Sequence, residues 1–154
     1  MIIKRLCIVL FFIILAVFPL SAANVSFLVM EVGQKGRQVY TQYPVMWEDD
    51  LLDVFFESGH IVSNSPMLQL NNQPQDTFPN EAERDFENAQ RGGMGYFMVA
   101  IVDYGLSDVT MRLFSTKSRE LLKEHKYNVK SFRNTKEEHA SIKSAVREMT
   151  DFLH

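Results

Sequence analysis

The acid best placed for chemistry is Asp103, which directly follows the apolar run Tyr96–Val102. Open α/β sheets bind ligands at the carboxyl ends of their parallel strands, so an acid there can face a bound molecule. Tyr104 and Asp108 follow within five residues and are expected nearby. The same residues are also typical of an ordinary strand-to-turn junction. Because no serine elbow, phosphate loop or second acid accompanies Asp103, we predict no catalytic residues.

The four histidines are scattered along the chain and show no metal-ligand spacing. A helical pair of ligands needs a spacing of four residues, and Lys143 stands four residues after His139. The only cysteine, Cys7, lies in the N-terminal apolar run, so the rest of the chain has no thiol for disulfides, zinc or nucleophilic catalysis. We therefore predict no metal and no cofactor. The histidines are His60, His125, His139 and His154.

Two loop regions are candidates for binding. Gly33–Gly36 has the glycine spacing of a loop that clamps nucleic acid, but that loop joins two helices, and a plain turn is favoured here. Aromatic residues often anchor protein interfaces, so Tyr40–Tyr43 and Phe78 form the preferred partner-binding patch. Trp47 belongs to a helical stripe and is expected in the core.

Met1–Ala23 has the pattern of a signal peptide. Two basic residues precede the apolar run Leu6–Leu20, and the small residues Ser21-Ala22-Ala23 follow it. We predict export to the periplasm with cleavage before Asn24. The alternative is an uncleaved anchor in the inner membrane, because the 18 residues of Leu6–Ala23 just reach the length of a membrane span.

The predicted mature chain, residues 24–154, is mildly acidic. The N-terminal segment holds two of the 16 Lys and Arg residues and none of the 19 Asp and Glu residues, which leaves a net charge of −5. A nucleic-acid surface needs clustered basic residues, so nucleic-acid binding is excluded. A chain of this size forms one domain and buries about two-thirds of its unfolded surface without cross-links.

Tyr96–Val102 predicts the central strand of this domain. Its odd and even positions are both apolar, so both of its faces should contact protein. We expect Ala100 and Val102 to face one layer, and Val99 and Ile101 to face the other.

The remaining patterns predict a single α/β (α+β) domain with a mixed sheet in the order β-α-β-α-β-β-β-α. Charged residues on the last strand indicate a protected edge. The closing helix should bury its apolar positions from Ile142 to Leu153, Phe152 included. The expected elements are strands at Val25–Val32, Ile61–Ser65, 109–113 and Leu121–Val129, helices at Val45–Glu57, 80–91 and 135–153, an irregular or one-turn segment at Met67–Leu70 and a loop at Asn71–Pro79.

Capping boxes are expected at the start of two helices. Asn80 with Glu83 and Thr135 with Glu138 have the spacing at which a first-turn acid completes the cap. Gly92 is expected to stop the first of these helices.

The layout resembles a small α/β module shared by the TolB amino-terminal domain, the lipoprotein activators of penicillin-binding proteins and the curli-secretion lipoprotein. The resemblance covers nearly all of Val25–Leu153 and consists of patterns of apolar residues and glycine. It implies an envelope protein that works by binding another protein. Several of these relatives are lipoproteins, whereas this chain has no cysteine at a lipidation position. The matching segments are Val25–Val32, Leu51…Phe55…Ser58-Gly59-His60-Ile61-Val62, Ala89…Gly95-Tyr96-Phe97-Met98-Val99 and Val109-Thr110-Met111-Arg112-Leu113.

Two functions are therefore open. The first is an exported, non-enzymatic module that binds or scaffolds an envelope protein and meets the membrane only through an uncleaved signal. The second is a small periplasmic enzyme or ligand-binding protein with its site near Asp103. A deep cavity lined by Asp103 and Tyr104 would favour the second.

Overall fold

The computed structural model describes residues 22–33, 43–106, 108–128 and 135–153. A six-stranded mixed sheet carries helices on both faces. The elements are β1 (Asn24–Val32), α2 (Tyr43–Glu57), β2 (Ile61–Asn64), β3 (Leu68–Leu70), the 3₁₀ turn η1 (Asn80–Ala82), α3 (Glu83–Arg91), β4 (Tyr96–Asp103), β5 (Asp108–Ser115), β6 (Leu121–Asn128) and α4 (Thr135–Thr150).

The strand order is β2-β1-β4-β5-β6, with β3 also paired to β1. β1 runs parallel to β2, β3 and β4, whereas β4, β5 and β6 form an antiparallel meander. The predicted mixed sheet is confirmed, and β6 lies at its edge as its charged residues indicated.

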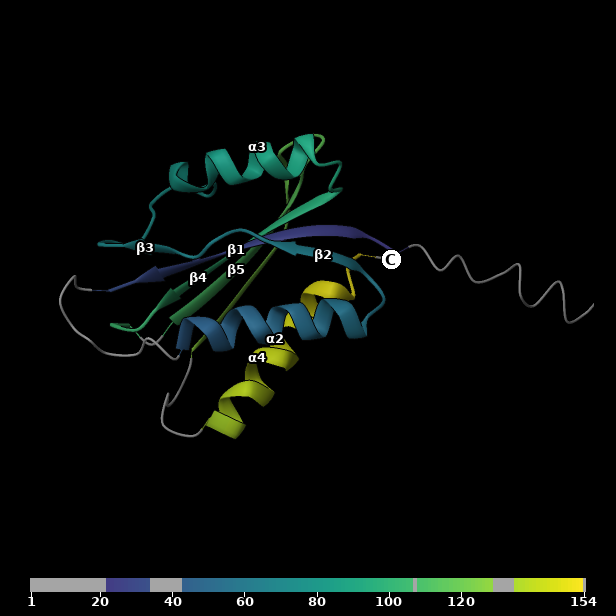
Figure 1. Ribbon diagram of the computed structural model, residues 1–154. Helices are drawn as coiled ribbons and strands as arrows, with labels where there is room; N and C mark the ends of the chain where they lie inside the picture. The colour runs from purple at the N-terminus through teal and green to yellow at the C-terminus, as the bar shows by residue number, and fades with distance from the viewer. Residues whose placement is uncertain (1–21, 34–42, 107, 129–134, 154) are drawn as a thin grey trace, which may run out of the picture.

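The sheet separates two apolar layers (Figure 1). α3 covers one face, and α2 and α4 cover the other; both views show this arrangement. Along β4, Ala100 and Val102 belong to the α2/α4 layer, and Val99 and Ile101 to the α3 layer. β1 and β4 are thus buried on both faces, which explains why these two segments are apolar at nearly every position.

α2 buries the predicted stripe and ends at a glycine. Trp47, Leu51 and Phe55 are fully buried against the sheet and α4. Gly59 adopts a left-handed φ of 78°, which a side chain would strain, and the chain turns there into β2. The adjacent His60 donates its backbone N–H to the Phe55 carbonyl.

Residues Leu68–Leu70, predicted as irregular or one-turn, form the short strand β3. Its residues pair with Met30–Val32 of β1, on the same side of β1 as β2, which pairs with residues 24–27 and ends at Asn64. The free outer side of β1 supplies the backbone partners, so three residues suffice for a strand that no local pattern indicates.

The predicted capping box at Asn80 and Glu83 does not form. Pro79 precedes the 3₁₀ turn η1, no side chain caps either η1 or α3, and Asn80 donates instead to Asp76. The Glu83 carboxylate accepts two hydrogen bonds from Arg119, whose guanidinium also lies 4.3 Å from the ring centre of Phe78. Glu83, which the local pattern assigned to the helix cap, therefore pairs with the distant Arg119 instead.

α3 ends directly before Gly92, as predicted; Gly92 has a φ of −76°, and Gly93 adopts the left-handed φ of 74°. The predicted end of the closing helix needs correction. Phe152 lies beyond the end of α4 and is 46% exposed, whereas Leu153 is buried. The helix stops at Thr150, so the periodicity that placed Phe152 inside no longer applies. The side chains of the second predicted capping box, Thr135 and Glu138, lie outside the described part.

Of the helices that the structure describes, none combines the length and the apolar character required to cross a membrane.

Candidate functional site

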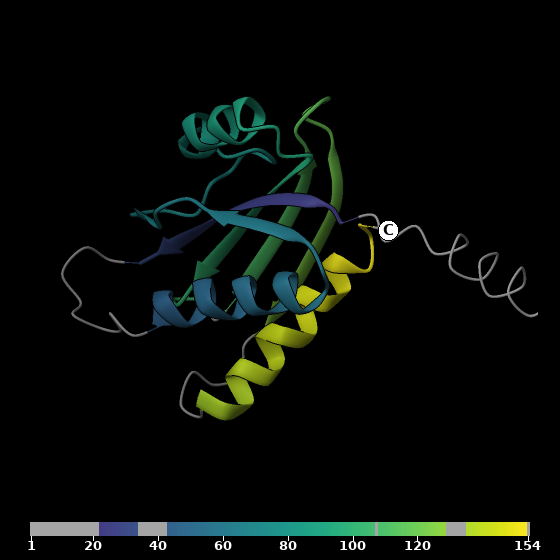
Figure 2. The same cartoon turned by 45° about the vertical axis from the view of Figure 1, so that its right-hand side comes forward.

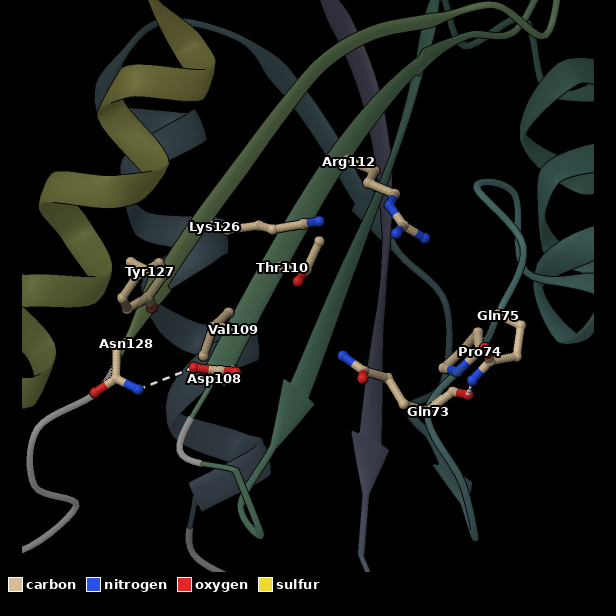
Figure 3. Close-up of a pocket in the computed structure, with 10 residues that line it drawn as sticks. All are labelled: Gln73, Pro74, Gln75, Asp108, Val109, Thr110, Arg112, Lys126, Tyr127 and Asn128. Carbon is tan, nitrogen blue, oxygen red and sulfur yellow. Dashed lines mark hydrogen bonds between the residues drawn. The ribbon is translucent and has the colours of Figure 1, made fainter.

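A polar groove of about 440 Å³ lies where the segment 73–75 passes over β5 and β6. In Figure 3, Thr110, Arg112 and Lys126 project from the two strands toward the face where Gln73 and Gln75 lie. This is the α3 side of the sheet, beyond the strands that α3 itself covers. Among the described elements, no helix covers this outer part of the face (Figure 1, Figure 2). Polar side chains line it, and a loop forms the opposite wall.

Arg112 holds the loop in place. Its Nη1 donates to the carbonyl oxygens of Asp76 and Thr77 at 2.9 and 3.0 Å, and its Nε donates to Glu124 at 2.7 Å. The Arg112 side chain is only 12% exposed. The hydrogen bond from Arg112, aided by Lys126 at 3.1 Å, holds the pKa of Glu124 below its ordinary value.

The groove contains one fixed acid–amide pair. Asn128 Nδ2 donates to Asp108 Oδ1 at 2.9 Å, as the dashed line in Figure 3 shows. Amide, hydroxyl, ammonium and carboxylate groups therefore face the groove together. These groups include both donors and acceptors, so they can make hydrogen bonds to a polar chain of either charge. The carboxylate of Asp108 already accepts the hydrogen bond from Asn128.

Asp103 lies opposite Asp108 in the β4–β5 pairing, as its predicted neighbourhood required. Its carboxylate is buried and accepts the backbone N–H groups of Gly105 and Leu106 at 2.9 and 3.0 Å. Asp103 thus stabilises the turn between β4 and β5, and neither Asp103 nor Tyr104 lines the groove.

A second acid at the strand ends lies on the other face. Glu31 pairs with Val102 in register, which directs it to the α2/α4 side, while Asp103 pairs with Val32 on the α3 side. Burial raises the pKa of Glu31, and hydrogen bonds from Tyr104 and Gln69 oppose that rise. The sheet separates the two carboxyl groups, so they cannot act as one acid–base pair.

Histidines predicted as ordinary residues take three structural positions. His60 is buried and accepts the backbone N–H of Ala23 at its Nδ1, and His125 pairs with Glu148 at 3.1 Å. His139 contacts the buried Asp50 at 2.7 Å across the α2–α4 interface. His154 lies outside the described residues.

The Asp50 contact is part of a row of contacts between acids of α2 and basic residues of α4. Lys143 lies 2.9 Å from Asp53 and 4.0 Å from Asp50, and Arg147 lies 3.5 Å from Glu57. Burial raises the pKa of Asp50, against the opposing effects of His139 and Lys143. The hydrogen bond to Asp53 raises the pKa of Lys143. In the described ranges, no group of three or more His, Cys, Asp or Glu residues is arranged to hold a metal ion.

The predicted aromatic patch is only partly available. The Phe78 ring packs edge-on against Phe86 and Phe114, at 5.2 and 5.0 Å between ring centres, and so contributes to the α3 layer. Tyr40 lies outside the described residues, as does the turn after Gly33, and nothing is described of the Tyr43 side chain. Trp47 is fully buried beside Tyr127, as predicted.

Sequence reasoning did not identify the groove. Arg112 and Asp76 are 36 positions apart, and Arg112 binds main-chain oxygens that every residue type carries. The one available signal was a set of polar residues at alternate positions of the mostly buried β5 and the partly exposed edge strand β6: Thr110, Arg112, Glu124 and Lys126.

These features define a single-domain α+β module with a mixed sheet. Two PelC dodecamer structures from Paraburkholderia phytofirmans share this fold at 11% sequence identity, with TM-scores of 0.51 and 0.50. The matches cover 86% of this chain and 90% and 87% of the PelC chains. A family model described as "Uncharacterised protein" matches residues 25–151, and the chain belongs to that family.

The solved structures that match this chain also include modules of the kind that the sequence resembles. The LpoB C-terminal domain from Salmonella enterica matches with a TM-score of 0.46 and 12% identity, over 77% of this chain and 90% of that one. TolB from Acinetobacter baumannii matches with a TM-score of 0.44 and 15% identity, over 83% of this chain and 29% of TolB. No curated protein matches the chain.

Proposed function

We propose that the chain is an exported, non-enzymatic module of the cell envelope that binds or scaffolds an envelope protein through the groove over β5 and β6. The observation that carries this proposal is that the two acids beside the groove, Asp103 and Asp108, already accept hydrogen bonds within the fold. Asp103 is bonded to its own turn and Asp108 to Asn128, while amide and hydroxyl groups line the open space. Such a surface supports contact with a polar partner more than proton transfer.

Export is supported by the N-terminal pattern, in which basic residues, an apolar run and small residues follow one another. The fold offers a second line of support. PelC shares it and assembles as a dodecamer, so in that protein the module takes part in protein–protein contact.

Site-specific crosslinking tests the proposed surface. A photoreactive residue replaces Gln75 or Lys126 in the tagged full chain, expressed in a bacterial host with an envelope, and in a control replaces Glu87 on the outer side of α3. We expect a discrete crosslinked protein from the groove positions and none from Glu87. Crosslinks from Glu87 alone would contradict the assignment of the groove.

The alternative function, an enzyme with its site at Asp103, is tested with a separate variant. Asp103→Asn keeps a side-chain carbonyl that can accept the two N–H bonds of the turn but removes the carboxylate. We expect its crosslinking pattern to equal that of the parent chain. Loss of function in a folded Asp103→Asn chain, with the crosslinks retained, would favour a site at Asp103.

A further inference from the structure

Exposed apolar side chains gather at one end of the domain. Among the residues that the structure describes, four large apolar side chains are exposed. Three of them lie on segments of one end: Phe56 in the last turn of α2, Ile61 at the start of β2 and Phe152 after the end of α4. The fourth, Leu106, follows β4 at the opposite end of the sheet. We call the end that carries Phe56, Ile61 and Phe152 the apolar end.

The fold brings the segments of the apolar end together around the start of β1. Asn24, the first residue of β1, pairs with Ile61 in the sheet. Glu57 at the end of α2 lies 3.5 Å from Arg147 near the end of α4. Figure 1 and Figure 2 both show the segment after α4 beside the start of β1.

The N-terminal segment joins the domain at this same end. Only Ser21, Ala22 and Ala23 separate the apolar run Leu6–Leu20 from β1. Three residues span about 11 Å at most, so the start of β1 stays within that distance of the lipid for as long as the run lies in a membrane. Of the two ends of the sheet, the one with three exposed apolar side chains is thus the one that export brings next to lipid.

Charge does not attract the apolar end to anionic lipid. Glu57 and Asp151, the chain neighbours of the two phenylalanines, are acidic, and Arg147 offsets only Glu57. Anionic headgroups attract clusters of Lys and Arg instead. A lipid contact at this end therefore depends on apolar burial, and large apolar side chains such as phenylalanine do bury at the boundary between headgroups and acyl chains.

We propose that the apolar end rests on the lipid surface of an envelope membrane, with Phe56, Ile61 and Phe152 inserted at the boundary between the headgroups and the acyl chains. The driving force is the removal of apolar surface from water, which requires no specific protein partner. In this orientation the groove lies in the half of the domain away from the lipid. Asp108, which lines the groove, pairs with Asp103 at the far end of β4.

The proposed lipid contact requires the export included in the proposed function, because the membrane in question belongs to the envelope. It does not require the groove to bind a protein. The groove and the apolar end share no residue, so crosslinking at Gln75 and Lys126 tests one surface and the lipid measurement tests the other. Either proposal can fail while the other holds.

Site-specific fluorescence tests the lipid contact. Phe56→Cys, Phe152→Cys and Leu106→Cys are each labelled with the same environment-sensitive fluorophore, in a full chain whose one native cysteine is replaced by Cys7→Ala. The chains are recovered from the envelope of a bacterial host and reconstituted with phosphatidylcholine vesicles. We expect the emission to shift to shorter wavelength at positions 56 and 152 and to stay unchanged at position 106, which controls for the affinity of the fluorophore itself. No shift at 56 and 152, or an equal shift at all three positions, would overturn the proposal.

Two further comparisons separate this contact from other occupants of the apolar end. Addition of phosphatidylglycerol to the vesicles should leave the shift unchanged, because the contact is apolar, and a shift that requires the anionic lipid would overturn the proposal. A shift that appears without vesicles and grows with protein concentration would identify a second copy of the chain as the occupant, and would overturn it as well.

A matched pair of surface variants tests whether the exposed apolar side chains supply the contact. In the labelled Phe152→Cys chain, Phe56→Ser should weaken the shift that vesicles induce, because it removes a side chain that is 76% exposed at the apolar end. Leu106→Ser removes a side chain that is 60% exposed at the opposite end and should leave the shift intact. Circular dichroism checks that both chains are folded. Equal effects of the two substitutions would contradict the proposed contact.

Discussion

At the scale of single residues, Glu124 gives the clearest pH-dependent prediction. Its lowered pKa means that the folded chain holds this proton less tightly than the unfolded chain does. The stabilisation is therefore present above the ordinary pKa of 4.5 and is lost as the pH falls through the lowered value.

Glu124→Gln should remove this stabilisation. Because the pair with Arg112 is partly exposed, we expect a loss of about 1 kcal/mol or less near neutral pH. Urea titrations at a series of pH values measure the difference between the two chains, which should shrink toward zero in acid. A difference that stays constant at every pH would show that the carboxylate charge is not its source.

Two histidine variants compare a contact to a buried carboxylate with a contact to an exposed one. His139 contacts the buried Asp50, and His125 contacts the exposed Glu148. His139→Ala removes the 2.7 Å contact to the Asp50 carboxylate, which is 3% exposed, and leaves Lys143 at 4.0 Å. An under-satisfied buried acceptor costs about 1–3 kcal/mol.

His125→Ala removes a contact with Glu148, whose side chain is 56% exposed, and should cost about 1 kcal/mol or less. Denaturant unfolding of both variants at neutral pH makes the comparison. Equal losses would mean that the α2–α4 contact does not depend on the Asp50 bond.

At the scale of elements, we expect truncations in the buried central strand β4 to cost the most stability. Ile101→Ala removes a side chain that is 1% exposed in the α3 layer and should cost about 2–5 kcal/mol. Ile61→Ala makes the same truncation where the side chain is 58% exposed, and should cost about 0.5 kcal/mol or less. Chemical denaturation provides the two free energies of unfolding, and similar values would contradict the burial of β4.

The position of the loop over the groove is expected to depend on Arg112, whose guanidinium donates to several acceptors at once. Arg112→Lys retains the charge beside Glu124 but cannot hold that carboxylate and the carbonyls of Asp76 and Thr77 at once. We expect faster proteolytic cleavage within residues 71–79, with Lys126→Arg as the control that leaves the anchor intact. Unchanged cleavage of the Arg112→Lys chain would show that other contacts hold the loop.

Most elements could be predicted from the sequence because their periodicity is strong. The apolar stripe from Trp47 to Phe55 and the strand Tyr96–Val102, which is apolar on both faces, directly indicate which residues are buried. β3 could not be predicted, since its pairing depends on the free edge of β1. The position of Asp103 was also predictable, but its hydrogen bonds to Gly105 and Leu106, which give it a structural role, required coordinates.

At the scale of the whole molecule, the sheet keeps two apolar layers apart. Phe86→Ala acts in the α3 layer and Val146→Ala in the α2/α4 layer, and these two layers share no residue. We expect the double variant to lose the sum of the two single losses, within about 0.5 kcal/mol.

A pair within one layer provides the contrast. Leu51 on α2 and Val146 on α4 belong to the same layer, so their combined truncation should depart from the sum. Thermal or urea unfolding of the parent chain and the five variants gives the coupling energies. Coupling across the sheet as large as coupling within one layer would contradict this separation.

The anchoring of the loop by Arg112 has a consequence for evolution. The guanidinium binds the carbonyl oxygens of Asp76 and Thr77, which persist whatever side chains occupy those positions. Under the proposed function, substitutions in residues 71–79 would therefore change what the groove binds while the loop keeps its place. Descendants of this chain would then acquire new binding preferences through substitutions in the loop, provided that one arginine on β5 is inherited.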